Sequence, residues 1–104
     1  MKVINVTKNN FNEEVLSSSK PVLIDFNANW CGPCRMLGPI LEEISNEIDN
    51  VKIVSVNIDN EEDLARQYGV MSIPCLVLIE NGHEKRRNVG LMPKDDVKRF
   101  IGVN

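Results

Sequence analysis

The chain has 104 residues, enough for one hydrophobic core and too few for two domains of usual size, so we expect a single domain over residues 1–104. Apolar residues make up 42% of the chain and aromatic residues only 5%, which predicts a mainly aliphatic core. A formal net charge of −3 argues against a nucleic-acid-binding protein, because that class needs a clustered basic face.

The first half of the chain alternates between predicted strands and helices. Val3–Thr7 favours a short strand, and Phe11–Leu16 favours a helix. Pro21–Ala28 is a nearly continuous apolar run, which is typical of a strand covered on both faces. Gly32–Ile48 then has apolar residues at helical spacing. Pro39 lies inside this long helix and should kink it, because proline removes a backbone hydrogen bond.

The second half continues the alternation. Val51–Ile58 is a second apolar run that predicts a strand, and Glu61–Tyr68 predicts a short helix. Ile73–Glu80 predicts another strand, which Asn81-Gly82 joins to a return strand at Glu84–Val89. Asn-Gly between two strands is a strong signal for a two-residue hairpin.

The last helix is predicted from Pro93 to Ile101. The whole order is therefore β-α-β-α-β-α-β-β-α, which predicts an α/β protein. Its central mixed five-stranded sheet should be flanked by helices on both faces.

The beginning of the chain and its cysteine content bear on its location. Met1–Thr7 has neither a long apolar run nor a small-residue cleavage site, so we expect no signal peptide. No segment approaches the roughly 20 apolar residues of a membrane span. Three cysteines do not suit a secreted disulfide scaffold, which usually has an even number. We therefore expect a cytoplasmic protein, in which cysteine pairs tend to be catalytic or metal-binding.

The motif Cys31-Gly32-Pro33-Cys34 stands at the start of the longest predicted helix. Residues three apart on a helix have β-carbons about 5–6 Å apart, which suits a disulfide. So small a ring stabilises a fold by only roughly 2 kcal/mol, which suits a bond that opens and closes. Cys31 lies where free N–H groups favour a thiolate, so it should attack a substrate disulfide. Cys34, one turn further in and less exposed, should resolve the mixed disulfide.

Several motifs, in this order and spacing, extend the pattern over essentially the whole chain: Asp25-Phe26, Ala28, Trp30–Cys34, Asn57-Ile58-Asp59, Tyr68-Gly69-Val70, Ile73-Pro74, Asn81-Gly82 and Val89-Gly90. Together they resemble the thioredoxin family. The resemblance implies a thioredoxin fold and a general protein-disulfide reductase that cycles between the Cys31/Cys34 dithiol and a redox disulfide. It also implies a thioredoxin reductase and disulfide-containing client proteins as partners. We expect a monomer with no bound cofactor, and the chain has no glycine motif for a nucleotide.

Asp25 is the candidate proton-exchanging residue. It lies in the middle of an apolar strand, where burial should raise its pKa. The resemblance implies that it exchanges a proton with Cys34. Ser55 replaces the lysine usual in the family, so we expect a higher Asp25 pKa than in members that keep the lysine. Asn27 stands where the family commonly has an aromatic residue.

The resemblance also implies a set of residues that contact client proteins around the reactive thiol. Pro74 matches the family's cis-proline, which would leave the backbone of Ile73 free to pair with an extended client segment. Gly90 matches a glycine of the substrate groove. The implied client-binding residues are Trp30, Gly32, Pro33, Ile73, Pro74 and Gly90.

Other functions stay open at this stage. A zinc site would need four ligands, and Cys31, Cys34, Cys75 and His83 form a possible set. We place Cys75 and His83 at opposite ends of one strand, about 26 Å apart, and therefore expect no metal site. Cys75 is expected to be a small buried apolar residue, with a regulatory thiol as the alternative.

Two alternatives concern the role of the cysteine pair. A disulfide oxidant or isomerase uses the same chemistry, but Gly-Pro between the cysteines and the absence of an export signal favour a reductant. A redox-independent binding subunit of a larger complex is the alternative from another class.

Overall fold

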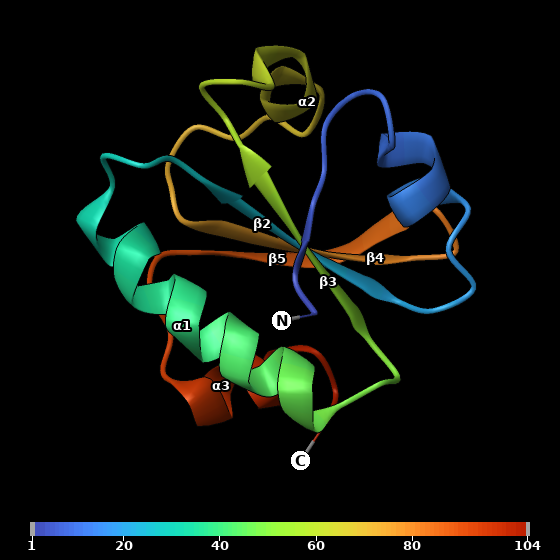
Figure 1. Ribbon diagram of the computed structural model, residues 1–104, viewed down its shortest axis with the longest axis vertical. Coiled ribbons are helices and arrows are strands. Elements are labelled where there is room, and N and C mark those ends of the chain that lie inside the picture. The colour runs from blue at the N-terminus through green and yellow to red at the C-terminus, as the bar shows by residue number, and fades with distance from the viewer. Residues whose placement is uncertain (1, 104) are drawn as a thin grey trace.

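The computed structural model describes residues 2–103, whose strands form one five-stranded sheet with the order β1-β3-β2-β4-β5 (Figure 1). The strands are β1 (Ile4–Asn5), β2 (Val22–Asn27), β3 (Lys52–Asn57), β4 (Cys75–Glu80) and β5 (His83–Val89). The first three are mutually parallel, whereas β4 runs antiparallel to β2 and β5. The predicted mixed five-stranded sheet is confirmed.

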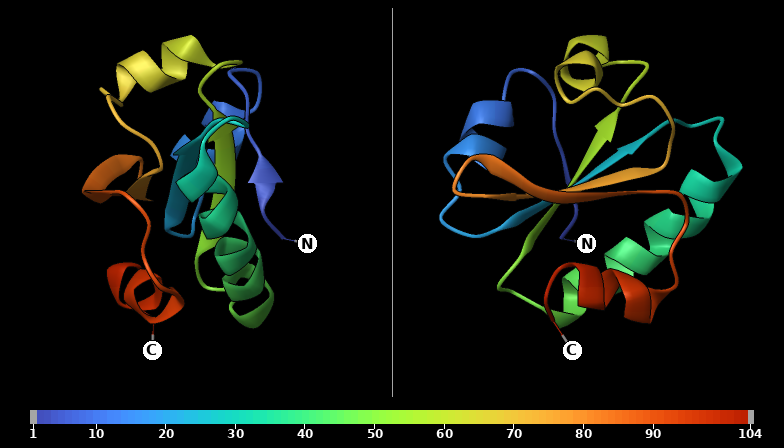
Figure 2. Two further views of the ribbon diagram at one scale, coloured as in Figure 1. Left: turned by 90° about the vertical axis from the view of Figure 1, so that its left-hand side faces the viewer. Right: turned by 180° about the vertical axis from the view of Figure 1, so that it is seen from behind.

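Helices cover both faces of this sheet. They are η1 (Asn12–Leu16), α1 (Gly32–Glu47), α2 (Glu62–Gln67) and α3 (Lys94–Phe100). The left view in Figure 2 shows α1 in front of the strands and η1 behind them. Side chains of η1 and α2 pack into one apolar core, and those of α1 and α3 pack into the other. The predicted α/β class and order of elements are therefore confirmed.

Strand β2 belongs to both cores because successive side chains of a strand point to opposite faces. Val22, Ile24 and Phe26 pack on the side of η1 and α2, whereas Leu23 packs on the side of α1 and α3. This explains the nearly continuous apolar run in the sequence. Asp25 shares the face of Leu23 and is the one buried charged residue among residues 2–103.

Each element begins or ends one or two residues away from its predicted position. The first helix is a single π-helical turn, in which the Ser17 N–H donates to the Asn12 carbonyl at 2.9 Å. Strand β4 begins at Cys75 rather than Ile73, because Pro74 has no N–H to offer the sheet. Strand β5 begins at His83, directly after the turn.

The hairpin between β4 and β5 follows the sequence signal. Asn81 and Gly82 have φ values of 53° and 80°, as the favoured two-residue turn requires at both positions. Helix α1 continues through Pro39 without interruption. Within residues 2–103, no helix combines the length and the apolar character needed to cross a lipid bilayer.

Candidate active site

The two motif cysteines form a disulfide at the start of α1. Their Cα atoms are 5.2 Å apart. Cys31 has an extended backbone and caps the helix, while Gly32 and Pro33 occupy its first two positions. Proline fits there because the first helical N–H groups have no partner within the helix. The local sequence therefore places the disulfide at a helix terminus.

The helix terminus acts on the two sulfur atoms differently. The Cys34 backbone N–H donates a hydrogen bond to Cys31 Sγ at 3.2 Å, so negative charge on Cys31 would be stabilised by this N–H and by the helix dipole. The expectation that Cys34 is less exposed is wrong for this disulfide state, because both residues are 5% exposed. They differ in their surroundings instead: Cys34 lines a solvent-open cavity together with Asp25.

Asp25 is 4% exposed, and its Oδ1 has no hydrogen-bond partner. Burial raises the pKa of this carboxyl group from 3.8 to about 7, although the Asn27 side chain partly opposes the shift. The predicted burial and raised pKa of Asp25 are therefore confirmed. Its pKa relative to family members that keep the lysine stays a prediction.

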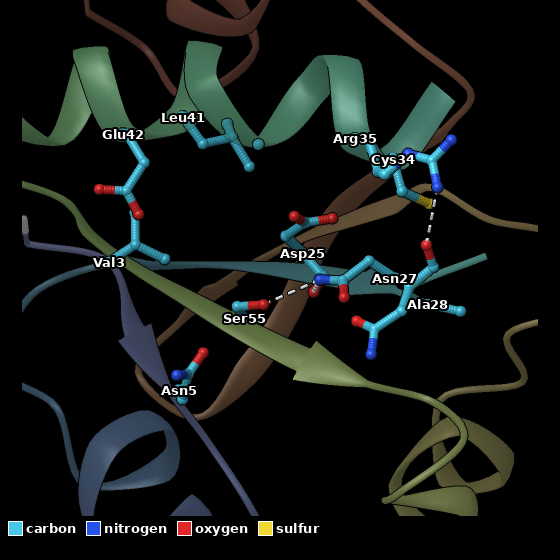
Figure 3. A pocket seen from close by; sticks show the side chains of 12 residues that line it. Val3, Asn5, Asp25, Asn27, Ala28, Cys34, Arg35, Leu41, Glu42 and Ser55 are labelled. Atoms are coloured by element: carbon cyan, nitrogen blue, oxygen red, sulfur yellow. Dashed lines mark hydrogen bonds between the residues drawn. The ribbon is translucent and has the colours of Figure 1, made fainter. Parts of the chain in front are cut away.

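The cavity beside Asp25 has a volume of about 350 Å³ and lies between the ends of β2 and β3 and the first turns of α1 (Figure 3). Its polar floor includes Asn27 and Ser55, which are joined by a 2.8 Å hydrogen bond. This bond joins residues 28 positions apart, so neither residue could be paired with the other from the sequence. The cavity is lined by Val3, Asn5, Asp25, Asn27, Ala28, Asn29, Cys34, Arg35, Gly38, Leu41, Glu42 and Ser55.

An apolar surface lies next to the disulfide. The Trp30 side chain is 67% exposed, and its indole Nε1 donates to Asp59 Oδ2 at 2.9 Å. Met71 is 94% exposed and lines the same shallow pocket as Trp30 and Ile73. Neither the pairing of Asp59 with Trp30 nor the place of Met71 on this surface was predicted from the sequence. For Met71, an apolar residue in the segment before Ile73-Pro74 was an available signal.

The segment before β4 reaches the disulfide from another part of the chain. The peptide bond between Ile73 and Pro74 is cis, which confirms the predicted cis-proline. Ile73 packs against the disulfide cysteines, and within residues 2–103 its backbone forms no hydrogen bond. The Gly90 N–H donates to the Pro74 carbonyl at 2.8 Å, and Gly90 has a φ of 106°. The fold thus brings Ile73 to the disulfide and ties Gly90 to Pro74.

Cys75 and His83 lie apart from this site. Cys75 is 1% exposed, and burial raises the pKa of its thiol. The placement of His83 on the same strand as Cys75 is wrong, because the hairpin turn puts His83 at the start of β5. There it lies opposite Glu80, whereas Cys75 lies opposite Val89 at the other end of the strand pair. Among residues 2–103, no cluster of three or more His, Cys, Asp or Glu side chains is arranged to hold a metal ion.

Comparison with known proteins gives one consistent result. Residues 2–102 match the family model described as Thioredoxin. The chain is 48% identical over 101 residues to thioredoxin from Rickettsia bellii, covering 96% of each chain. It is 49% identical over 90 residues to thioredoxin 1 from Synechococcus elongatus, covering 86% of this chain and 84% of the relative. It is 41% identical over 103 residues to thioredoxin C-2 from Corynebacterium nephridii, covering 98% and 95%.

Proposed function

Because the chain belongs to the thioredoxin family and acts as a protein-disulfide reductase, we propose that Cys31 is its attacking thiol, Cys34 its resolving thiol and Asp25 its proton-exchanging group. The observation that carries this assignment is the 3.2 Å hydrogen bond from the Cys34 N–H to Cys31 Sγ. It distinguishes the two sulfurs, because it would stabilise a thiolate on Cys31.

The reaction takes place in two exchanges. The Cys31 thiolate attacks one sulfur of a client disulfide, the client S–S bond breaks, and the released client thiolate takes up a proton. The Cys34 thiol then gives its proton to the Asp25 carboxylate and attacks Cys31 Sγ. The mixed disulfide breaks, and the second client sulfur leaves as a thiolate that is protonated. The client gains two electrons and two protons, and the chain is left with the Cys31–Cys34 disulfide.

The raised pKa of Asp25, about 7, supports its part in this reaction. A group with a pKa near the working pH both accepts and releases protons readily. Asp25 and Cys34 line the same cavity, which gives the proton a route between them. Asp25 therefore takes the Cys34 proton during the second exchange.

The client segment binds in an extended conformation across the disulfide. The unpaired backbone of Ile73 offers it strand-like hydrogen bonds. Trp30 supplies exposed apolar area beside Cys31. Gly32 has open space where a Cβ would lie, so it lets a client backbone approach closely, and Pro33 restrains the turn between the two cysteines. Pro74 and Gly90, joined by their backbone hydrogen bond, hold the other side of this surface in place.

The reaction consumes the dithiol, so a partner must reduce it again. We assign this to a thioredoxin reductase, as expected for this family. The chain works as a monomer in the cytoplasm. It needs no bound cofactor or metal, because its two thiols already carry the two electrons that each turnover transfers. Its clients are disulfide-containing proteins rather than nucleic acids or membranes.

A coupled insulin-reduction assay tests the proposal with the wild type, Cys31→Ser and Cys34→Ser. We expect insulin reduction by the wild type alone. Cys34→Ser should accumulate a mixed disulfide with insulin, visible by mass spectrometry, whereas Cys31→Ser should form none through residue 34. A mixed disulfide that forms only in Cys31→Ser would reverse the two assignments. A double Cys→Ser variant that retains full function in the cell would support the redox-independent binding subunit instead.

A further inference from the structure

We propose that Asn27 and Ser55 form a positioning pair that sets the proton affinity of Asp25 and so tunes the resolving step. This inference rests on the proposed role of Asp25 and adds two residues to it. Neither residue touches the reacting sulfurs through a hydrogen bond among the described residues, so both act through Asp25.

The contacts of the Asn27 amide are the first support. Its Nδ2 group donates to Ser55 Oγ at 2.8 Å (Figure 3). The same group donates to the Asp25 backbone carbonyl at 2.9 Å. An amide nitrogen has two N–H groups, and these two bonds use both. The Asn27 side chain is therefore held in one orientation between β2 and β3.

The sheet register brings the three residues together. Asp25 and Asn27 are two residues apart on β2, so their side chains share one face. Ser55 lies opposite Asp25 on β3. Further back on the same face, Leu23 and Ile53 belong to the apolar core. This face therefore changes from apolar to polar beneath Cys34, where a buried carboxyl group needs polar neighbours to ionise.

The uncharged side chains of Asn27 and Ser55, rather than the ionisable groups around Asp25, are the ones that favour its charged form. Helix α1 contributes Arg35, Glu42 and, once reduced, Cys34 to the cavity walls. Cys75 on β4 packs in the core on the opposite face of the sheet, although the charge of Asp25 still acts on its thiol. The Arg35 guanidinium donates to the Asn29 carbonyl at 3.3 Å. The side chains that β1 and β3 contribute are not ionisable. Burial raises the pKa of Asp25, and the Asn27 side chain is the influence that lowers it.

The experiment follows the Asp25 carboxyl carbon by NMR titration of the oxidised protein and measures the pH dependence of insulin reduction. We compare the wild type with Asn27→Leu and Ser55→Ala. Asn27→Leu should raise the Asp25 pKa, because it replaces the amide group beside the buried carboxyl group by an apolar side chain and so disfavours the charged form further. Ser55→Ala should shift it in the same direction by less, since Asn27 keeps one of its two bonds.

Two further variants separate positioning from a loss of structure. Ser55→Thr keeps the hydroxyl group and should restore the wild-type titration. Asn57→Ala is the matched control on the neighbouring strand end, since Asn57 accepts hydrogen bonds from the Asp59 and Asn60 backbones and makes none to Asp25. It should leave the Asp25 titration unchanged even if the protein becomes less stable.

The outcomes distinguish this inference from the proposed role of Asp25. An unchanged Asp25 titration in both Asn27→Leu and Ser55→Ala overturns the positioning pair, whatever happens to activity. A shifted titration with a matching shift of the pH profile supports it. If the pH dependence of insulin reduction is identical in the wild type and Asp25→Asn, the role of Asp25 in the reaction is refuted. The proposed effect of Asn27 and Ser55 on catalysis is then refuted as well. If Asn27→Leu does not fold, Ser55→Ala alone decides.

Discussion

Replacement of Asp25 by asparagine should make the oxidised protein more stable at high pH. Asp25 is 4% exposed, and its pKa is raised from 3.8 to about 7 on folding. Asparagine has nearly the same shape and never ionises. The variant therefore removes the cost of burying a charge while leaving the packing of β2 almost unchanged.

The sign and size of this stability difference follow from the raised pKa of Asp25. A carboxyl group with a raised pKa in the folded state binds its proton more tightly there than in the unfolded chain, so it favours folding most at low pH. This contribution is complete below about pH 4 and is lost as the pH rises through about 7. The shift of about 3 pH units corresponds to about 4 kcal/mol, as an order of magnitude. Above pH 8 the asparagine variant should therefore be the more stable protein by up to this amount.

Guanidinium chloride unfolding of both oxidised proteins between pH 4 and 9 measures this difference. All other ionisable groups are common to both chains, so their effects cancel. Asp95→Asn, at an exposed position in the first turn of α3, controls for the loss of one carboxylate. The reasoning is refuted if the free-energy difference between wild type and Asp25→Asn is the same at pH 5 and pH 9.

Four further predictions concern other parts of the molecule. Leu37→Ala should lower the free energy of unfolding by about 2–5 kcal/mol in denaturant titrations, because Leu37 is fully buried in the core beneath α1. Gly90→Ala should cost about 1–2 kcal/mol in the same assay; an added Cβ has room, so the cost comes from the φ of 106°. Trp30→Ala should slow insulin reduction with little change in the unfolding midpoint, because the side chain is mostly exposed. Cys75 should stay unmodified in mass spectra after mild peroxide, since it is buried and its thiol pKa is raised; rapid oxidation would favour a regulatory thiol.

The sequence alone was sufficient for features that depend on neighbours along the chain. Helical spacing placed Cys31 and Cys34 at a disulfide distance, and the Asn81-Gly82 pair specified its own turn, because a few dihedral angles decide both. Continuous apolar runs identified strands covered on both faces, and one aspartate within such a run already implied a buried carboxyl group. These signals are local, so no knowledge of the fold was needed to interpret them.

Tertiary structure decided what depends on distant segments meeting. Only the pairing of β2 with β3 brings Asn27 and Ser55 together next to Asp25. The hairpin register places His83 on β5 opposite Glu80, whereas strand length alone had placed it on the same strand as Cys75. The burial of both disulfide cysteines likewise involves Ile58 and Ile73, which pack against their cluster from other parts of the chain. Burial and pKa are set by such contacts, because the electrostatic field and the solvent exposure of an atom depend on every group packed near it, whatever its distance along the chain.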